Sequence, residues 1–335
     1  RGSHPIELVG DDKYHFNEIV VLEDVAVDIE EKFTGREWRV AEENVKTEIT
    51  ESGPVRATVT ISGKIMNSPF KQEISIYNNS PRIDVTIYID WEGRKNTQVR
   101  LAFPFNVPNG TVTYEAPYAA VRFDKDEIPG SYRGSGGRWI GKWIDISNEK
   151  YGVTIASRTS GGTIIQGTKV YPLLLNVSFS CGDILLWYHN KGEHTFEFSI
   201  LPHEGSWKDA YAFRHGWEFT NPVIVDHRTT TLFYKMEETK PKLPEKLSLC
   251  SINVPNVMVS VFKKSDVENK WIIRAIEMCG RNGEAELTLA KDVEEAYETN
   301  LLEEEIGKLE AKNNKVRLKV SPHGIHTISV KLKHS

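Results

Sequence analysis

The chain has 335 residues, 39% hydrophobic and 27% charged, and can therefore bury cores of ordinary size without disulfides or metal. Its 42 basic and 47 acidic residues leave a formal net charge of −5, and no basic stretch is interleaved with aromatics as a nucleic-acid groove requires. The longest apolar stretch, Tyr171 to Val177, is far shorter than the roughly twenty residues of a membrane helix. We therefore expect a soluble, cytoplasmic protein with neither nucleic acid nor membrane as a partner.

The start of the chain and its cysteines suggest a fragment of an intracellular protein. Residues 1–4 (RGSH) look like the remnant of an expression tag and are left out of the fold reasoning. The remainder begins at Pro5 without an initiator Met, so we expect it to be cut from something longer. Cys181, Cys250 and Cys279 are too widely spaced for a disulfide framework or a Cys-x-x-Cys metal site, and we expect free thiols.

Residues 5–45 contain one plausible strand, Glu18 to Leu22, which we expect to pair at a sheet edge. Residues 53–92 then hold three successive period-two runs rich in Val, Ile, Thr and Tyr, each closed by turn residues. In the first run, apolar Val55, Ala57, Val59 and Ile61 alternate with polar Arg56, Thr58, Thr60 and Ser62. This alternation indicates a sheet with one solvated face, and the three runs together predict an antiparallel meander.

Strand-like runs recur to about residue 235 at the spacing of a large sandwich or barrel, without a helix of normal length. We therefore predict an all-β protein whose first domain, residues 5–238, is a large antiparallel β-sandwich. The polar, proline-containing segment 239–246 predicts a linker. A smaller β-sandwich is predicted over 247–335 from the runs Val257–Phe262, Trp271–Met278, Ala285–Ala290, Val316–Val320 and Gly324–Lys333.

One segment of the second domain supports two interpretations. Glu294 to Leu309 carries Leu301, Leu302, Ile306 and Leu309 at nearly helical spacing. Gly307 instead favours a turn and a strand, so a helix and a strand both remain open here.

Several short motifs resemble the C-terminal β region of glycoside hydrolase family 38, the α-mannosidases. In family order they are GPVRATV followed by SPRID with a later Trp, LAFPFNV (Leu101–Val107), TYEAPY (Thr113–Tyr118), WIDISNEKYGVTI (Trp143–Ile155), FSILPHEGSWKDA (Phe198–Ala210) and ETNLLEEE (Glu298–Glu305). The resemblance covers roughly residues 50–330. It implies a supersandwich of the galactose-mutarotase type followed by a smaller sandwich.

The resemblance also implies where the catalytic machinery lies. In the resembled enzymes, retaining hydrolysis depends on a zinc ion held by two His and two Asp, in an N-terminal α/β domain and the helical segment after it. No His-x-Asp sequence is present in this chain, and His189 and His194 carry no strong ligand signature. We therefore assign no catalytic and no metal-binding residue, expect zinc in the missing N-terminal domain, and leave open whether this chain alone is an enzyme.

Glycosidase chemistry in this chain would need two carboxylates. They would lie about five ångströms apart if the anomeric configuration is retained, or roughly six to ten ångströms apart if it is inverted. Single candidates are Glu115, Asp124, Asp126 and Glu204, each also readable as a turn or surface acid. His203 and Glu204 in PHEGSW lie side by side at a predicted strand end and could transfer protons. The alternative, favoured by the family's similar motif, makes His203 a hydrogen-bonded scaffold residue.

Aromatic side chains are the candidates for carbohydrate contact, because the apolar C–H faces of sugars pack on flat rings. Trp139 and Trp143 lie four residues apart in a glycine-rich segment, and Trp187 and Tyr188 lie on a predicted hairpin. Tyr114 and Tyr118 flank Glu115 in TYEAPY and could line a cleft. In each case the alternative is a core or sheet-edge role.

One departure from the family concerns sugar preference. α-Mannosidases tend to carry an Arg-bearing loop between two late strands, whereas residues 173–194 of this chain contain no Arg. Lys191 could supply a point charge there, without the bidentate geometry of Arg.

Two functions from different classes follow. The leading hypothesis is the non-catalytic C-terminal β portion of a zinc-dependent, retaining α-mannosidase, which supplies scaffold and one wall of the substrate cleft. Its expected partners are mannosides, the N-terminal catalytic domain of the same enzyme and, in a homo-oligomer, further copies of the chain. The alternative is a free-standing carbohydrate-binding or mutarotase-like module.

Overall fold

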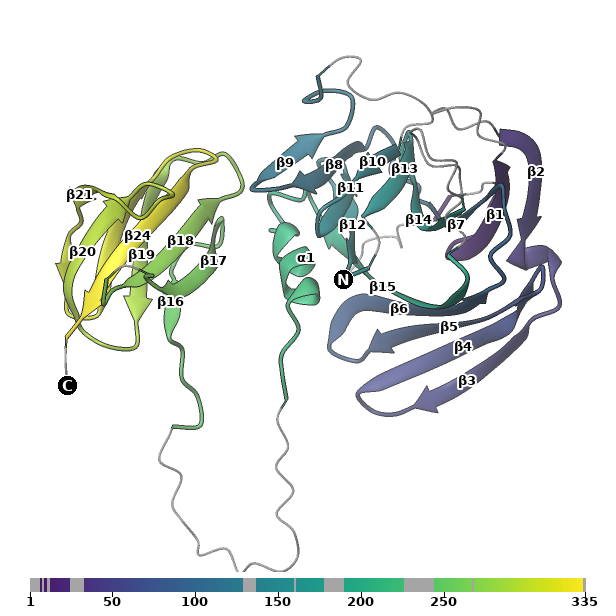
Figure 1. The fold of residues 1–335 in the computed structure, drawn as a ribbon, viewed down its shortest axis with the longest axis horizontal. Coiled ribbons are helices and arrows are strands. Elements are labelled where there is room, and N and C mark those ends of the chain that lie inside the picture. Colours follow the sequence, from purple (N-terminus) through teal and green to yellow (C-terminus); the bar gives the residue numbers. More distant parts are fainter. Residues whose placement is uncertain are drawn as a thin grey trace, which may run out of the picture. The chain divides into compact units, whose positions relative to one another are not determined.

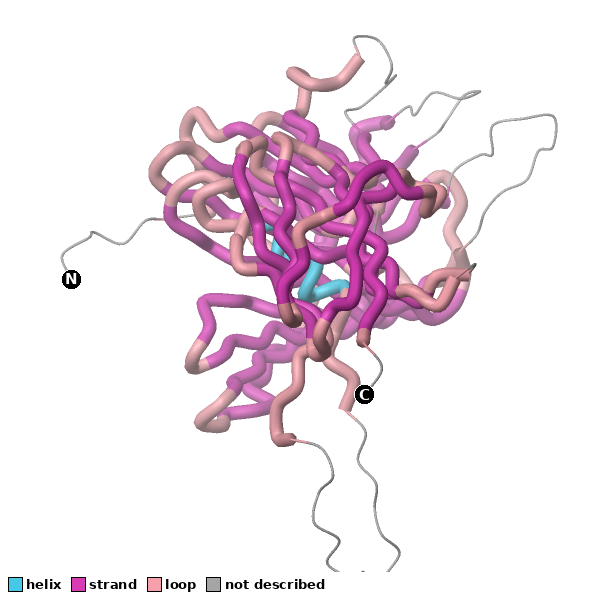
Figure 2. Tube along the Cα trace, turned by 90° about the vertical axis from the view of Figure 1, so that its left-hand side faces the viewer, coloured by secondary structure: helices cyan, strands magenta, loops and turns pink. Residues whose placement is uncertain are grey.

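The computed structural model describes residues 7, 9–10, 13–24, 33–128, 137–159, 161–177, 190–225, 244–266 and 268–333. The chain divides into two compact units, Arg1–Asn221 and Pro222–Ser335, and each is described by itself. Strands dominate both units, with antiparallel pairing throughout, which confirms the predicted all-β class (Figure 1). The described residues contain one α-helix, and it is too short and too polar to cross a membrane (Figure 2).

The first unit contains two antiparallel sheets. In spatial order, the nine-stranded sheet consists of β3 (Lys46–Ser52), β4 (Arg56–Ile65), β5 (Ser68–Tyr77), β6 (Ser80–Trp91), β15 (Gly192–Glu204), β12 (Tyr151–Ser157), β11 (Trp143–Ser147), β8 (Thr111–Ala116) and β9 (Ala119–Arg122). The six-stranded sheet consists of β10 (Gly137–Trp139), β13 (Gly162–Gln166), β14 (Lys169–Val177), β7 (Thr97–Pro104), β1 (Glu18–Asp24) and β2 (Phe33–Arg39), which is followed by the short 3-10 helix η1 (Val40–Glu42). The predicted entry strand is β1, which pairs with both β2 and β7 and therefore does not form the sheet edge.

The core of this unit lies between the two sheets. Phe103 of β7 contacts Phe198 of β15 across the interface, with ring centroids 6.1 Å apart. The predicted meander is β4, β5 and β6, joined by tight turns.

The predicted solvated face of the first run is wrong: Thr58 and Thr60 are buried, whereas Val55 is exposed. Hydroxyl contacts with Ser75 and Thr50 on the neighbouring strands satisfy the two buried threonines.

The helix α1 (Phe213–Thr220) corrects the expectation that no helix interrupts this domain. It packs against β11 and β12. A Cβ atom added at Gly216 would lie 2.6 Å from the Cβ of Trp143, so this helix turn needs glycine to approach the strand. With eight residues, the helix is shorter than the window over which helical periodicity can be read from sequence, and so it does not stand out among the strands.

The second unit is the predicted smaller sandwich. Its four-stranded sheet consists of β16 (Cys250–Ile252), β19 (Gly283–Leu289), β23 (Lys315–Val320) and β22 (Ala311–Lys312). Its five-stranded sheet consists of β17 (Val257–Lys264), β18 (Trp271–Glu277), β24 (Ile325–Leu332), β20 (Val293–Thr299) and β21 (Glu305–Lys308). All five predicted runs are strands, and residues of both sheets share one apolar core.

The ambiguous segment of the second unit is a hairpin. β20 and β21 pair across residues 300–304, and Leu301, Leu302 and Ile306 are exposed. The strand interpretation is therefore correct, and the helical spacing of these side chains does not correspond to a buried face. Cys250 and Cys279 are free thiols, whereas Cys181 and residues 239–243 of the predicted linker lie outside the described residues.

Candidate functional site

The aromatic candidates divide into exposed and buried side chains. Trp139, at the end of β10, is 61% exposed, and Tyr118, in the turn between β8 and β9, is 41% exposed. Trp143 has no exposed surface and packs against Trp207, with ring centroids 5.2 Å apart. Tyr114 is also buried. Only Trp139 and Tyr118 therefore offer a sugar an accessible ring among the described candidates; Trp187 and Tyr188 lie outside the described residues.

Tyr114 instead belongs to a clasp between the two sheets. Its hydroxyl donates a hydrogen bond to Oε1 of Glu127 at 2.6 Å. Arg138 of β10 binds the same carboxylate through Nε at 2.7 Å and Nη2 at 2.8 Å. Hydrogen bonding from Arg138 holds the pKa of Glu127 below its ordinary value. Because Tyr114 and Arg138 come from different sheets, the clasp fixes β10 and with it the position of Trp139.

Glu115 is a buried carboxylate beside this clasp. Its Oε2 accepts a hydrogen bond from the backbone nitrogen of Lys142 at 2.5 Å, and the Lys142 Nζ lies 3.9 Å from Oε1. The ammonium also lies 3.9 Å from the ring centroid of Trp217 on α1. Burial raises the pKa of Glu115, and the hydrogen bond and charge of Lys142 only partly oppose this shift. Glu115 can therefore hold a proton at higher pH than an ordinary glutamate.

The other carboxylate candidates have ordinary surroundings. Asp126 is bound by Arg122, whose Nε lies 2.9 Å away, and this hydrogen bonding lowers the pKa of Asp126 to about 2. The exposed Asp124 lies 3.8 Å from Arg138. Glu204 is exposed at the end of β15. These contacts are those of turn and surface acids.

His203 binds an aspartate that sequence reasoning missed. Its Nε2 lies 2.7 Å from Oδ2 of the fully buried Asp145. Asp145 also accepts hydrogen bonds from the hydroxyls of Ser147 at 2.5 Å and Thr154 at 2.7 Å. This arrangement favours the scaffold interpretation of His203. The sequence does hold one signal for Asp145. In WIDIS, Asp145 and Ser147 are two residues apart and so lie on the same face of the strand, where they can hydrogen-bond to each other.

The pKa of His203 reflects two opposing influences. Burial favours the neutral imidazole, but the hydrogen bond and negative charge of Asp145 outweigh it, so the pKa of His203 is raised. The imidazole Nδ1 faces the backbone oxygen of Glu204 at 3.4 Å. His203 thus fixes the end of β15 through its contacts with the Asp145 carboxylate and the Glu204 backbone oxygen.

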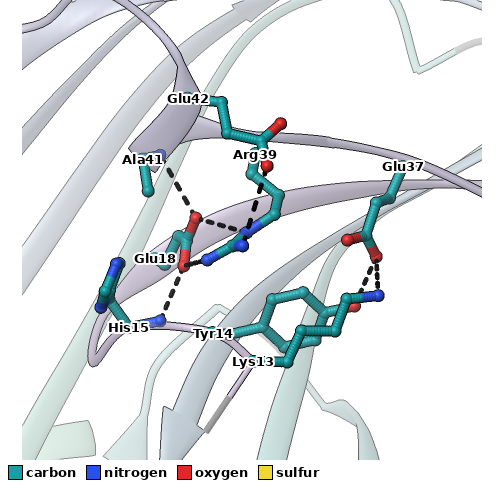
Figure 3. A network of polar contacts seen from close by, with 8 residues as sticks. All are labelled: Lys13, Tyr14, His15, Glu18, Glu37, Arg39, Ala41 and Glu42. Carbon is teal, nitrogen blue, oxygen red and sulfur yellow. Dashed lines mark hydrogen bonds and ion pairs between the residues drawn. The ribbon is translucent and has the colours of Figure 1, made fainter.

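A second charged network, also missed from sequence, links β1, β2 and the segment before β1 (Figure 3). The buried Glu18 accepts hydrogen bonds from Arg39 through Nε at 3.0 Å and Nη2 at 2.9 Å. It also accepts from the backbone nitrogens of His15 and Ala41.

The same network extends to Glu37, which binds both Lys13 at 2.7 Å and the hydroxyl of Tyr14 at 2.8 Å. Burial together with the Glu37 hydrogen bond raises the pKa of Tyr14 far above its ordinary value. The acceptors are occupied by protein donors, so this network is suited to fixing the chain segment against β2. Its members are scattered in sequence and share no motif.

Metal binding would require a group of His, Cys, Asp or Glu side chains. In the part of the chain that the structure describes, no three His, Cys, Asp or Glu side chains gather in a group that could hold a metal ion. The described donors therefore do not fit the zinc site of the resembled family, and we assign no zinc ligand among them.

Two family models match the chain in succession. The glycosyl hydrolases family 38 C-terminal domain matches residues 24–179. The glycosyl hydrolases family 38 C-terminal beta sandwich domain matches residues 256–328. The two matches fall in the two structural units, in chain order.

Curated relatives and solved structures agree with these matches. Alpha-mannosidase 2C1 of Homo sapiens is 22% identical over 266 residues, covering 76% of this chain and 24% of that protein. Alpha-mannosidase G of Dictyostelium discoideum is 24% identical over 248 residues, covering 69% of this chain and 21% of that protein. The crystal structure of an alpha-mannosidase from Enterococcus faecalis V583 covers 94% of this chain and 38% of that chain, with a TM-score of 0.74 at 14% identity, and so shares the fold. The chain spans about a quarter of the length of the curated relatives it matches.

Proposed function

The chain belongs to glycosyl hydrolase family 38, as its C-terminal β region, and from this we propose that it is the non-catalytic β portion of a zinc-dependent, retaining α-mannosidase. The observation that carries the proposal is the pair of family matches over both sandwiches, in a chain whose match covers about a quarter of the length of its α-mannosidase relatives. The remaining length is where we place the catalytic carboxylates and the zinc ion. Mannosides and that N-terminal part are then the partners; homo-oligomerisation stays a prediction.

In this proposal the β portion serves as scaffold and as one wall of the substrate cleft. Support for the wall comes from the terminal strands of the two sheets, β9 and β10, which serve as the base of this edge: Trp139 is exposed at the end of β10, and Tyr118 is exposed in the turn before β9. The Tyr114–Glu127–Arg138 clasp fixes that base, so the indole is held in place before a sugar arrives. A fixed flat ring loses little conformational entropy when it packs against the C–H face of a sugar.

The test uses the full-length enzyme, including the N-terminal part. Trp139→Ala is expected to lower kcat/KM for an aryl α-mannoside roughly tenfold, about 1.4 kcal/mol of transition-state binding. Tyr118→Ala is expected to have a smaller effect in the same direction. Tyr88→Ala is the matched control, because Tyr88 is similarly exposed on β6, away from this edge. Unchanged kcat/KM in both the Trp139 and Tyr118 variants would exclude the edge from the cleft.

A further inference from the structure

The small unit contains a cavity of about 350 Å³ at one end of its sandwich. This volume lies within the range of small-molecule sites in proteins. The lining residues come from both sheets and the adjoining loops: Leu249, Phe262, Asn269, Trp271, Leu289, Ala290, Lys291, Val330, Leu332 and Lys333. The cavity is therefore a place where the two sheets do not close against each other.

One wall of the cavity is a pair of aromatic rings. Phe262 of β17 and Trp271 of β18 stack with centroids 5.1 Å apart and planes inclined by 15°. Both rings are partly buried: they pack against the apolar core of the small unit and also line the cavity. Leu289 and Val330, which are core residues, add the apolar floor. The cavity is therefore lined on this side by aromatic rings and aliphatic side chains, which present an apolar surface to a ligand.

The rim of the cavity is polar. Asn269, Lys291 and Lys333 are exposed lining residues that can donate hydrogen bonds, and the Asn269 amide can also accept them. The Lys333 Nζ lies 3.8 Å from Oδ2 of Asp292, which leaves this ammonium partly neutralised. None of the ten described lining residues is acidic, so this cavity has no carboxylate pair for hydrolysis and is suited to binding.

We propose that this cavity binds a single pyranose unit of a glycan. A pyranose presents one apolar C–H face, which matches the Phe262–Trp271 wall, and a ring of hydroxyls, which matches the polar rim. The ligand would insert between β18 and the turn that carries Lys291, with hydroxyls accepting from Lys291 and exchanging hydrogen bonds with Asn269. The small unit then holds a carbohydrate site of its own, because every lining residue lies within it.

Calorimetric titration of the 335-residue chain with methyl α-D-mannopyranoside tests this proposal. Saturable binding with a Kd on the order of 1 mM is expected, and an α-linked mannobiose should bind at least as tightly. Asn269→Ala and Lys291→Ala are expected to weaken binding roughly three- to tenfold, since each removes hydrogen-bonding capacity from an exposed rim. Lys319→Ala is the matched control, because Lys319 is an exposed lysine of β23 outside the cavity.

Trp271→Phe tests the aromatic wall while keeping a ring at this position. It should weaken sugar binding, because the smaller ring offers less area for stacking. The absence of saturable binding up to about 50 mM ligand would overturn the proposal. Binding that survives all three cavity variants but disappears in Trp139→Ala would also overturn it, by placing the site on the large unit. Loss of kcat/KM in the full-length enzyme is a separate readout, so this inference and the proposed function fail independently.

Discussion

The large and the small sandwich use their tryptophans differently. In the large unit, Trp91 and Trp143 are among the largest fully buried side chains, whereas in the small unit the partly buried Trp271 lines an open cavity. The large unit also buries charged and polar groups around Asp145 and Glu18, where protein donors occupy the acceptors. A large aromatic ring or a buried acid is therefore a candidate for ligand binding only when its neighbours leave part of its surface or its hydrogen-bonding capacity unoccupied.

The largest expected difference is between the losses of unfolding free energy caused by truncating Trp143, a core residue, and Trp271, a cavity-lining residue. Trp143→Ala is expected to lower the free energy of unfolding of the large unit by about 3–5 kcal/mol, because it removes a fully buried ring. Trp271→Ala should lower that of the small unit by less, because its ring already borders empty space. Differential scanning calorimetry measures both transitions. An equal or larger loss for Trp271→Ala would make that ring a core residue and remove the contrast.

Breaking the buried His203–Asp145 pair should have the next largest effect. Asp145→Ala leaves His203, Ser147 and Thr154 without their shared acceptor, and we expect a loss of about 3 kcal/mol. Glu204→Ala is the control, because Glu204 is exposed beside His203 and should change the unfolding free energy by less than about 0.5 kcal/mol.

The same pair predicts a pH dependence. Since the folded pKa of His203 is raised, its stabilising charge interaction is fully present below the ordinary histidine pKa of about 6.5 and is lost as pH rises through the folded value. The destabilisation caused by Asp145→Asn should therefore be largest under mildly acidic conditions and shrink as pH increases. Urea unfolding across this range measures it; a difference that grows with pH would contradict the account.

Adding a methyl group at the contact between α1 and β11 should lower the unfolding free energy by less than the loss of Asp145 does. Gly216→Ala would place a methyl group 2.6 Å from the Trp143 Cβ, and we expect a loss of about 1–3 kcal/mol from the large unit. Gly307→Ala in β21 is the matched control, because an added Cβ there meets nothing within 4 Å. Thermal unfolding of both variants checks this, and equal melting temperatures would mean that the helix does not approach the strand so closely.

The smallest expected effect is that of Glu115→Gln. Because burial raises the folded pKa of Glu115, ionisation destabilises the folded state as pH rises above the ordinary glutamate pKa of about 4.3. The neutral amide should therefore stabilise the large unit modestly at neutral pH, with the difference vanishing in acid. Glu149→Gln at an exposed position serves as control. A destabilised Glu115→Gln variant at neutral pH would show that the Lys142 charge outweighs burial.

Local patterns predicted the strands well and the buried contacts poorly. The alternation of the 53–92 segment and the five runs of the small unit identify strands, because side chains on the two sides of a sheet face different surroundings. The helix α1 was missed because its eight residues are too few for a periodicity to be recognised, although its buried residues lie on the side that packs against β11 and β12. Trp139 and Trp143 look equivalent in sequence, yet only the long-range contact of Trp143 with Trp207 and Gly216 distinguishes them.

We propose that this β portion needs an N-terminal partner for hydrolysis, and activity measurements on the chain alone and on the full-length protein can decide this. With an aryl α-mannoside and added zinc, we predict turnover only when the chain is joined to the N-terminal part. Turnover by the purified chain alone, in fractions where activity and protein elute together, would contradict the account.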